Sequence, residues 1–364
     1  MKSAEEPQLP IGTGQEFWEE RKKETLPAQE IKNTATWVNP AFKDTAPFKL
    51  KEGEPTNLIL FLTQPKESNH GAQKAKRKLV ILPELERGRS GLLGQIIFSD
   101  QDGRLYRDLN IKGVGLFEKA VENGGYTASP VRPTARDNEI LGIFDYEDAV
   151  KDAAWAEELL KAGIRTYRIV AIVDLHEIVY SRGEMVSVEE AKKMHILYSD
   201  SRPVAEIRAF GTKERISHLA HPSSKRLKAA LKDTKALVAQ ELGKDDLTFE
   251  DYAEWFAKTL GEQMARLRKA GLVHGNLFSQ NITLDCRIVD LDTVKRIKEI
   301  DFSEKDPHKN EVQTYEREFD NTAEALATLL DFMRASDDIR LPRDRVTYLR
   351  YFREAYYKEL KKSL

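Results

Sequence analysis

The feature that most constrains the fold is a change in hydrophobic pattern near residue 220. Before it, short runs rich in Ile, Leu and Val are bounded by Gly, Asp and Asn, which is typical of strands joined by turns. After it, apolar residues recur at helical spacing, as in Tyr252, Phe256, Leu260 and Met264. Strands followed by helices predict an α+β protein of two lobes.

The same patterns locate the individual elements. The expected strands are 57–64, 78–85, 92–100, 105–115, 165–181 and 204–212, and the expected helices are 146–161, 224–242, 316–335 and 343–362. Asp102 and Gly103 predict a hairpin turn, and Thr248 with Asp251 predicts the start of a further helix. We therefore expect a proline-containing extended arm at 1–50 with a short helical stretch near 16–23, a β-rich lobe at 51–216 and a helical lobe at 217–364.

Composition excludes several classes of protein. The 364 residues carry 58 basic and 60 acidic side chains, so the net charge of −2 gives no overall attraction to nucleic acid or to an anionic membrane. A single cysteine, Cys286, excludes an internal disulfide framework and a cysteine-based zinc site. No apolar run approaches the roughly 18 residues of a membrane span, and the first residues lack the apolar stretch of a secretory signal. We expect a cytoplasmic protein with neither nucleic acid nor membrane as partner.

The most informative segment is 274–281, which begins with His274 and ends with Asn281, with Asp290 nine residues later. Residues 282–284 and 287–289 are expected to form the two strands of a short hairpin, which would bring Asn281 and Asp290 to neighbouring ends. Mg²⁺ prefers oxygen ligands and often takes only one or two from the protein. The segment therefore predicts a metal site, and the alternative is an ordinary surface hairpin with polar ends.

Lys112 and its flanking glycines form a second candidate. A lysine at the end of a strand can hold nucleotide phosphates, and Gly113 and Gly115 would let the backbone approach them. A lysine on the solvent face of a strand is the alternative.

Arginines supply the third and fourth candidates. Gly88 and Arg89, in the expected turn 86–89, could cap phosphates because an arginine matches phosphate oxygens in a bidentate manner, or could be a plain exposed turn. Arg208 and Arg215 lie seven residues apart, a pair that means little by itself.

Taken in order, these pieces resemble the selenoprotein O family, protein adenylyltransferases with a bilobal kinase-like fold. The resemblance covers about residues 85–330, with low similarity between the matched motifs. It rests on segments 86–89, 111–115, 162–168, 274–281 and 319–321 and on the spacings of Arg208, Arg215, Asn281 and Asp290. It implies nucleotide contacts by Gly88, Arg89, Lys112, Arg208 and Arg215, and Mg²⁺ or Mn²⁺ held by Asn281 and Asp290.

Several features depart from the family pattern, including its second Asp-Gly pair, which has no clear counterpart among residues 120–142. Gln280 stands where the family has the aspartate expected to act as general base, and an amide cannot take a proton at neutral pH. The family's glutamate partner of the lysine falls nearest Asp152, with Glu157 as a less direct candidate. The family's C-terminal cysteine or selenocysteine is also absent.

The resemblance implies transfer of AMP from ATP to a hydroxyl group of an unidentified protein substrate. The first alternative is a pseudoenzyme that binds nucleotide without catalysing transfer. A kinase that transfers the γ-phosphoryl group is the second.

Overall fold

The computed structural model describes residues 15–63, 77–81, 87–119, 126–129, 142–180, 184–220, 224–300, 315–336 and 339–362. These residues form two compact units. The first, the strand unit, falls within Met1–Lys151 and Arg168–Phe210, and the second, the helical unit, within Asp152–Tyr167 and Gly211–Leu364. A mixed α+β protein is therefore confirmed for the described part of the chain.

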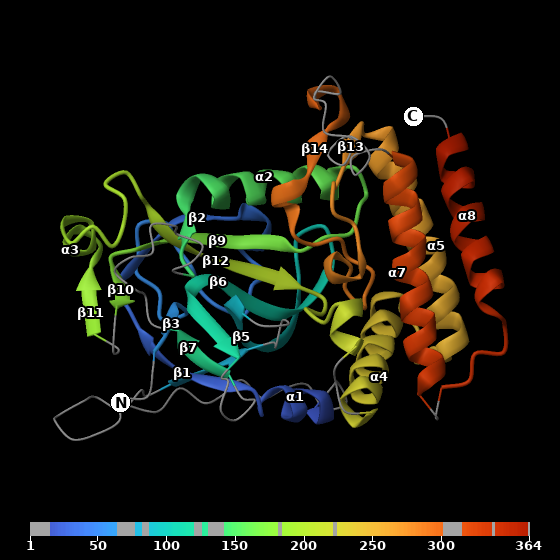
Figure 1. The fold of residues 1–364 in the computed structure, drawn as a ribbon, viewed down its shortest axis with the longest axis horizontal. Helices are drawn as coiled ribbons and strands as arrows, with labels where there is room; N and C mark the ends of the chain where they lie inside the picture. Colours follow the sequence, from blue (N-terminus) through green and yellow to red (C-terminus); the bar gives the residue numbers. More distant parts are fainter. Residues whose placement is uncertain are drawn as a thin grey trace. The chain divides into compact units, whose positions relative to one another are not determined.

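The strand unit is built on one large antiparallel sheet (Figure 1). Its strands along the main path are β2 (Asn33–Val38), β9 (Arg168–Leu175), β12 (Pro203–Phe210), β6 (Leu105–Lys119), β5 (Arg87–Ser99), β4 (Arg77–Ile81), β1 (Thr25–Glu30) and β3 (Leu60–Leu62), in that spatial order. β7 (Tyr126–Ser129) pairs with β6, and β8 (Phe144–Asp145) pairs with β12. The first fifty residues, expected to be an extended arm, contribute β1 and β2 together with α1 (Gln15–Arg21) and a 3₁₀ turn, η1 (Pro40–Phe42).

The sheet has an apolar face because β6 and β12 alternate apolar and polar residues. Leu109 and Ile111 on β6 and Ile207 on β12 belong to one buried hydrophobic cluster. The predicted hairpin between β5 and β6 is confirmed, and Gly103 in its turn has a φ of 76°. The expected strand 165–181 is two strands, because β9 ends at Leu175 and β10 (Glu177–Tyr180) turns back to pair with β11 (Glu184–Ser187).

The helical unit contains α4 (Ser224–Glu241), α5 (Phe249–Lys269), α7 (Tyr315–Ala335) and α8 (Arg345–Lys361). The predicted start of α5 is confirmed, since the Thr248 hydroxyl and the Asp251 carboxylate cap each other's backbone N–H groups. One face of α5 is buried, including Phe256, Leu260 and Met264, and α5 lies alongside α7 and α8 (Figure 1).

A short β-element interrupts these helices. After α5 ends, β13 (Leu272–Val273) pairs with β14 (Lys295–Arg296), and the 21 residues between them carry the metal-site candidates. Helix α2 (Tyr146–Lys161) has the bounds predicted from the sequence. None of the helices in the described ranges is both long and apolar enough to cross a bilayer.

Candidate functional site

A row of buried polar residues lies on one face of the strand unit's sheet. In the antiparallel register of β6 and β12, Lys112 is opposite Glu206 and Asn110 is opposite Arg208. All four side chains are buried. Since directly paired residues project from the same face and alternate residues share a face, these four side chains form one polar cluster. The sequence analysis named Lys112 and Arg208 as nucleotide contacts, and the structure places both on this shared face.

Arg208 is held in place by its neighbour on β6. Its Nε and Nη2 donate to Asn110 Oδ1 at 3.1 and 2.7 Å. Asn110 Nδ2 in turn donates to the carbonyl oxygen of Gly91 on β5 at 2.7 Å. The guanidinium group therefore keeps a fixed orientation on the sheet.

Lys112 lies over an aromatic ring. Its ammonium nitrogen is 3.9 Å from the centre of the Phe144 ring, a favourable cation–π distance. Glu206 was missed in the sequence analysis, although its spacing of two residues from Arg208 on a strand indicates the shared face. Glu206 lies directly opposite Lys112 in the strand pair and partly offsets the positive charge of this buried cluster.

The glycines next to Lys112 have a packing role. Gly113 and Gly115 have φ values of 87° and 92°. A Cβ atom at Gly113 would lie 2.8 Å from Phe144 Cβ, and one at Gly115 would lie 2.8 Å from the Phe61 ring. Their backbone conformation and these close approaches explain both glycines without a phosphate.

The expected turn at 86–89 is wrong for its described part. Glu86 lies outside the described residues, whereas Gly88 and Arg89 belong to β5, where Gly88 is paired with Phe117 of β6. A Cβ at Gly88 would lie 2.4 Å from the Phe117 ring, so the glycine allows the strand to continue past this side chain. Arg89 Nη1 donates to the Ile143 carbonyl oxygen at 3.3 Å.

In the helical unit, Asn281 and Asp290 are connected through the backbone. The N–H of Val289, the residue before Asp290, donates to the Asn281 carbonyl oxygen at 3.0 Å. The two expected hairpin strands are reduced to one isolated bridge between Ile282 and Ile288. The shortened hairpin brings residues 281 and 289 together, whereas the sequence prediction concerned Asn281 and Asp290.

The Asn281 side chain has an unused acceptor. The residue is 1% exposed, and its Nδ2 donates to the Asn276 carbonyl oxygen at 2.8 Å. Its Oδ1 is buried and has no hydrogen-bond partner among the described residues. Burying such an oxygen without a partner is costly, and this oxygen is therefore the most distinctive polar atom of the loop.

Asp290 has a backbone conformation that few residues adopt. Its φ of 71° and ψ of 61° lie in the left-handed region, which aspartate enters more readily than most residues. The side chain is half-buried. Backbone conformations of this kind concentrate at functional sites, and here the conformation lies at the end of the loop that also carries Asn281.

His274 is a buried, neutral organiser of the same loop. Its Nε2 is 2.9 Å from the Val289 carbonyl oxygen and donates to it, while its Nδ1 accepts from the Asn276 N–H at 3.3 Å. Burial lowers the pKa of His274, and the charge of Arg215 acts in the same direction. The imidazole therefore fixes the loop rather than carrying charge.

Glu318 on α7 is a functional candidate that the sequence analysis missed. Its carboxylate is fully buried and accepts the backbone N–H of Gly275, and its Oε2 has no hydrogen-bond partner among the described residues. Burial raises the pKa of Glu318 to about 7, although the N–H groups of Gly275 and His274 act against the rise. No spacing in the sequence distinguishes Glu318 from the solvated acids of the same helix.

The remaining predicted residues have the following places. Arg215 forms an isolated bridge with Thr283, so it lies beside the loop of Asn281. Gln280 is exposed in the 3₁₀ turn η4 (Ser279–Asn281). Asp152 is buried and accepts a hydrogen bond from the Tyr167 hydroxyl.

The donor set of this loop fits a magnesium or manganese ion. Among the described residues no group of three or more His, Cys, Asp or Glu side chains could hold a metal. A nucleotide-bound Mg²⁺ needs only one or two protein oxygens, because phosphates and water supply the rest. The buried Oδ1 of Asn281 and the carboxylate of Asp290 meet that requirement.

A separate cavity of about 570 Å³ lies in the strand unit and contains none of the predicted site residues. It is lined by residues of the segment 38–55 and by Val170. Both lysines and acids stand around it, including Lys43, Lys49, Asp44 and Glu54, so its charge favours no class of ligand.

Neither a protein-family model nor a curated protein sequence matches this chain. Among solved structures, ROP2 from Toxoplasma gondii is described as a virulence factor with a protein-kinase fold and no enzymatic activity. It is 12% identical, with 82% of this chain and 81% of ROP2 covered and a TM-score of 0.37. The kinase domain of a Toxoplasma gondii rhoptry antigen is 10% identical, with coverages of 79% and 81% and a TM-score of 0.36. Neither match establishes a common fold at these TM-scores.

Proposed function

We propose that this chain binds ATP with Mg²⁺ or Mn²⁺ on a kinase-like scaffold and transfers AMP to a hydroxyl group of a protein. The observation that carries the metal role is the buried Oδ1 of Asn281, which has no hydrogen-bond partner among the described residues. The N–H of Val289 ties the Asn281 backbone to the residue before Asp290. The assignment of AMP transfer rests on the ordered motifs that resemble the selenoprotein O family.

In this proposal each unit supplies its own set of groups. Asn281 and Asp290 hold the metal, and Arg215, beside the same loop, contributes positive charge to the phosphates. In the strand unit, Lys112 and the fixed guanidinium of Arg208 supply further positive charge. The metal, when bound, neutralises phosphate oxygens, so that positioning and charge stabilisation provide most of the catalysis.

The transfer itself balances as a displacement at phosphorus. The substrate hydroxyl oxygen forms a bond to the α-phosphorus of ATP, and the bond from that phosphorus to the bridging α–β oxygen breaks. Pyrophosphate leaves, and AMP remains joined to the protein through a phosphodiester. The hydroxyl proton goes to water, since the amide of Gln280 cannot accept it and His274 is committed to the Val289 carbonyl oxygen.

A nucleotide-binding pseudoenzyme is the second candidate. The exposed amide of Gln280 at the position of the family base is the observation that favours it. Binding without turnover would still raise the melting temperature in the presence of ATP, because a ligand that binds only the folded state stabilises it by mass action. A phosphoryl-transferring kinase is the third candidate and differs in the moiety transferred.

The deciding experiment follows label transfer from ATP marked on the α-phosphate or, separately, on the γ-phosphate, with Mg²⁺ or Mn²⁺. Asp290→Ala and Asn281→Ala test the metal role, and Asp331→Ala, an exposed acid on α7, is the matched control. Incorporation from the α-label alone, lost with Asp290→Ala but kept in the control, supports adenylyl transfer. We expect Gln280→Asp not to reduce it.

Each other outcome selects an alternative. Incorporation from the γ-label identifies a kinase. No incorporation, together with stabilisation by ATP, identifies the pseudoenzyme. An Asp290→Ala protein as active as wild type removes the metal role assigned to this residue.

A further inference from the structure

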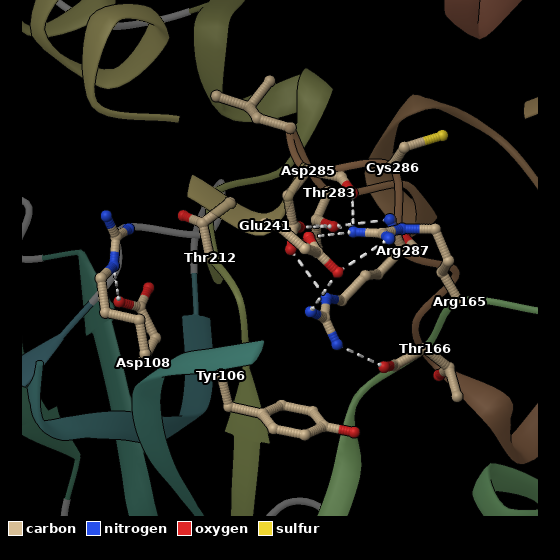
Figure 2. Close-up of polar contacts among 12 residues, drawn as sticks. Tyr106, Asp108, Arg165, Thr166, Thr212, Glu241, Thr283, Asp285, Cys286 and Arg287 are labelled. Carbon is tan, nitrogen blue, oxygen red and sulfur yellow. Dashed lines mark hydrogen bonds and ion pairs between the residues drawn. The ribbon is translucent and has the colours of Figure 1, made fainter. Parts of the chain in front are cut away.

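A network of four charged side chains surrounds the turn that joins Asn281 to Asp290 (Figure 2). The network consists of Asp285 and Arg287 in the turn, Arg165 in the segment after α2, and Glu241 at the end of α4. We propose that Arg165 and Glu241 are positioning residues for the metal loop. This inference rests on the proposed function, and neither residue is assigned a contact with nucleotide or metal.

The inner part of the network shapes the turn. Asp285 Oδ1 accepts the Thr283 hydroxyl at 2.6 Å, and its Oδ2 accepts Arg287 Nε at 2.7 Å. Asp285 and Arg287 are 0% and 2% exposed. Both carboxylate oxygens are therefore used within the turn, in which Cys286 has a φ of 60°.

The outer part joins the turn to distant segments. Arg165 binds both carboxylate oxygens of Glu241, from Nη1 at 2.9 Å and from Nη2 at 2.7 Å. The same Nη2 donates to the Asp285 carbonyl oxygen at 3.2 Å. Burial acts against ionisation of Glu241, but the charges of Arg165 and Arg287 and the hydrogen bonds from Arg165 lower its pKa. Glu241 thus keeps Arg165 oriented toward the turn.

The backbone of Arg165 carries this restraint to the metal loop. The Ile288 N–H donates to the Arg165 carbonyl oxygen at 2.9 Å, and the Thr166 hydroxyl donates to the Ile288 carbonyl oxygen at 2.6 Å. Ile288 is followed by Val289, whose N–H binds Asn281. A loosened Arg165 therefore releases the residues that set the separation of Asn281 and Asp290.

The ion pair between Arg165 and Glu241 can be changed without removing the one between Asp285 and Arg287. The side chains of Arg165 and Glu241 are 23% and 18% exposed, and Glu241→Gln preserves shape while removing the charge. The ion pair between Arg266 and Glu359, at 29% and 8% exposure, is a matched control because it joins α5 to α8 in the same unit. Glu359→Gln removes the same kind of charge from a carboxylate outside the turn and leaves Arg266 in place, whose Nη1 donates to the Gly163 carbonyl oxygen at 2.7 Å.

Two measurements test the inference in the full chain. The first is amide hydrogen exchange at Ile288 and Val289, which requires neither ligand nor activity. The second is a titration of Mn²⁺ in the presence of ATP, followed by the paramagnetic resonance of the free ion and read against the same titration without protein, because ATP alone also binds Mn²⁺. Substitutions of residues that support metal ligands commonly weaken metal binding about 10- to 100-fold.

We expect Glu241→Gln to speed exchange at both amides and to weaken Mn²⁺ binding about tenfold, whereas Glu359→Gln leaves both unchanged. Arg165→Lys keeps the positive charge but loses the bidentate contact with Glu241. Its exchange rates and its Mn²⁺ affinity should lie between those of wild type and Glu241→Gln. If wild type binds Mn²⁺ but Glu241→Gln and Glu359→Gln have the same exchange rates and the same Mn²⁺ affinity, this inference alone is overturned. A wild type that binds no Mn²⁺ with ATP overturns the proposed function and the metal role together.

Discussion

The buried carboxyl group of Glu318 makes the stability of this protein depend on pH in a direction that can be measured. Its pKa is raised by burial from 4.5 to about 7. The folded state therefore binds a proton between these two pH values that the unfolded state has released. The contribution of Glu318 to the unfolding free energy is therefore greatest at or below pH 4.5. It falls as the pH rises toward 7 and is constant above pH 7.

The magnitude follows from the size of the shift. One pKa unit corresponds to about 1.4 kcal/mol, so a shift from 4.5 to about 7 corresponds to about 3 kcal/mol of unfolding free energy. Glu318→Gln keeps an oxygen for the Gly275 N–H but cannot ionise. We expect this variant to lose none of that stability between pH 5 and pH 8.

The assay is urea unfolding of wild type and Glu318→Gln at several pH values from 5 to 8. His274 acts in the opposite sense, because its lowered pKa removes stability as the pH falls through about 6.5 and below. The relevant quantity is therefore the difference between variant and wild type at each pH, in which the effect of His274 largely cancels. Glu316→Gln, an exposed acid on the same helix, is the control and should follow wild type. If the difference between Glu318→Gln and wild type is the same at pH 5 and pH 8, the assigned burial effect is wrong.

Three further predictions concern other buried groups. Gly211→Ala should lower the unfolding free energy, measured in urea, by about 3 kcal/mol or more. The new Cβ would lie 1.9 Å from Asp285 Oδ2 and break a buried ion pair. Gly94→Ala is the control and should leave the unfolding free energy unchanged, because no atom lies within 4 Å of its Cβ. Cys286 should react with a thiol reagent only on unfolding, because it is buried and burial raises its pKa. Lys112→Met should weaken ATP binding, measured by calorimetry, about 10- to 100-fold, which is the loss expected for a charge-assisted hydrogen bond to phosphate. An unchanged affinity for ATP would remove Lys112 from the nucleotide site.

Local signals in the sequence account for the parts of the fold that were predicted correctly. The bounds of α2 follow from apolar periodicity, and the start of α5 follows from the mutual capping of Thr248 and Asp251, both of which involve residues within one or two turns. The position of β5 was predicted less well. Its first residues, including Gly88, look like a turn in sequence, but pairing with β6 makes them a strand. Pairing with a distant strand overrides a local turn preference.

The candidate site shows the same division between local and distant information. The spacing of nine residues between Asn281 and Asp290 predicted a short hairpin, and the backbone bond between residues 281 and 289 lies where that hairpin was expected. The contact between Arg165 and Glu241 joins positions 76 residues apart, and the one between Glu318 and Gly275 joins positions 43 apart. An acid and an arginine at such separations look like any solvated surface residues. Only the fold brings them together and buries them.

The pattern of satisfied and unsatisfied polar atoms gives the strongest physical argument for a metal at Asn281. In the adjoining turn, Asp285 uses both carboxylate oxygens and the Arg287 side chain reaches the Thr166 carbonyl oxygen at 3.1 Å. Other buried side-chain atoms of the described residues also lack a hydrogen-bond partner, including Arg165 Nε of the same network and Glu318 Oε2. Buried polar atoms are otherwise almost always hydrogen-bonded. In the proposed function, the unused Oδ1 of Asn281, a few residues away from this turn, is the atom that a bound metal would satisfy.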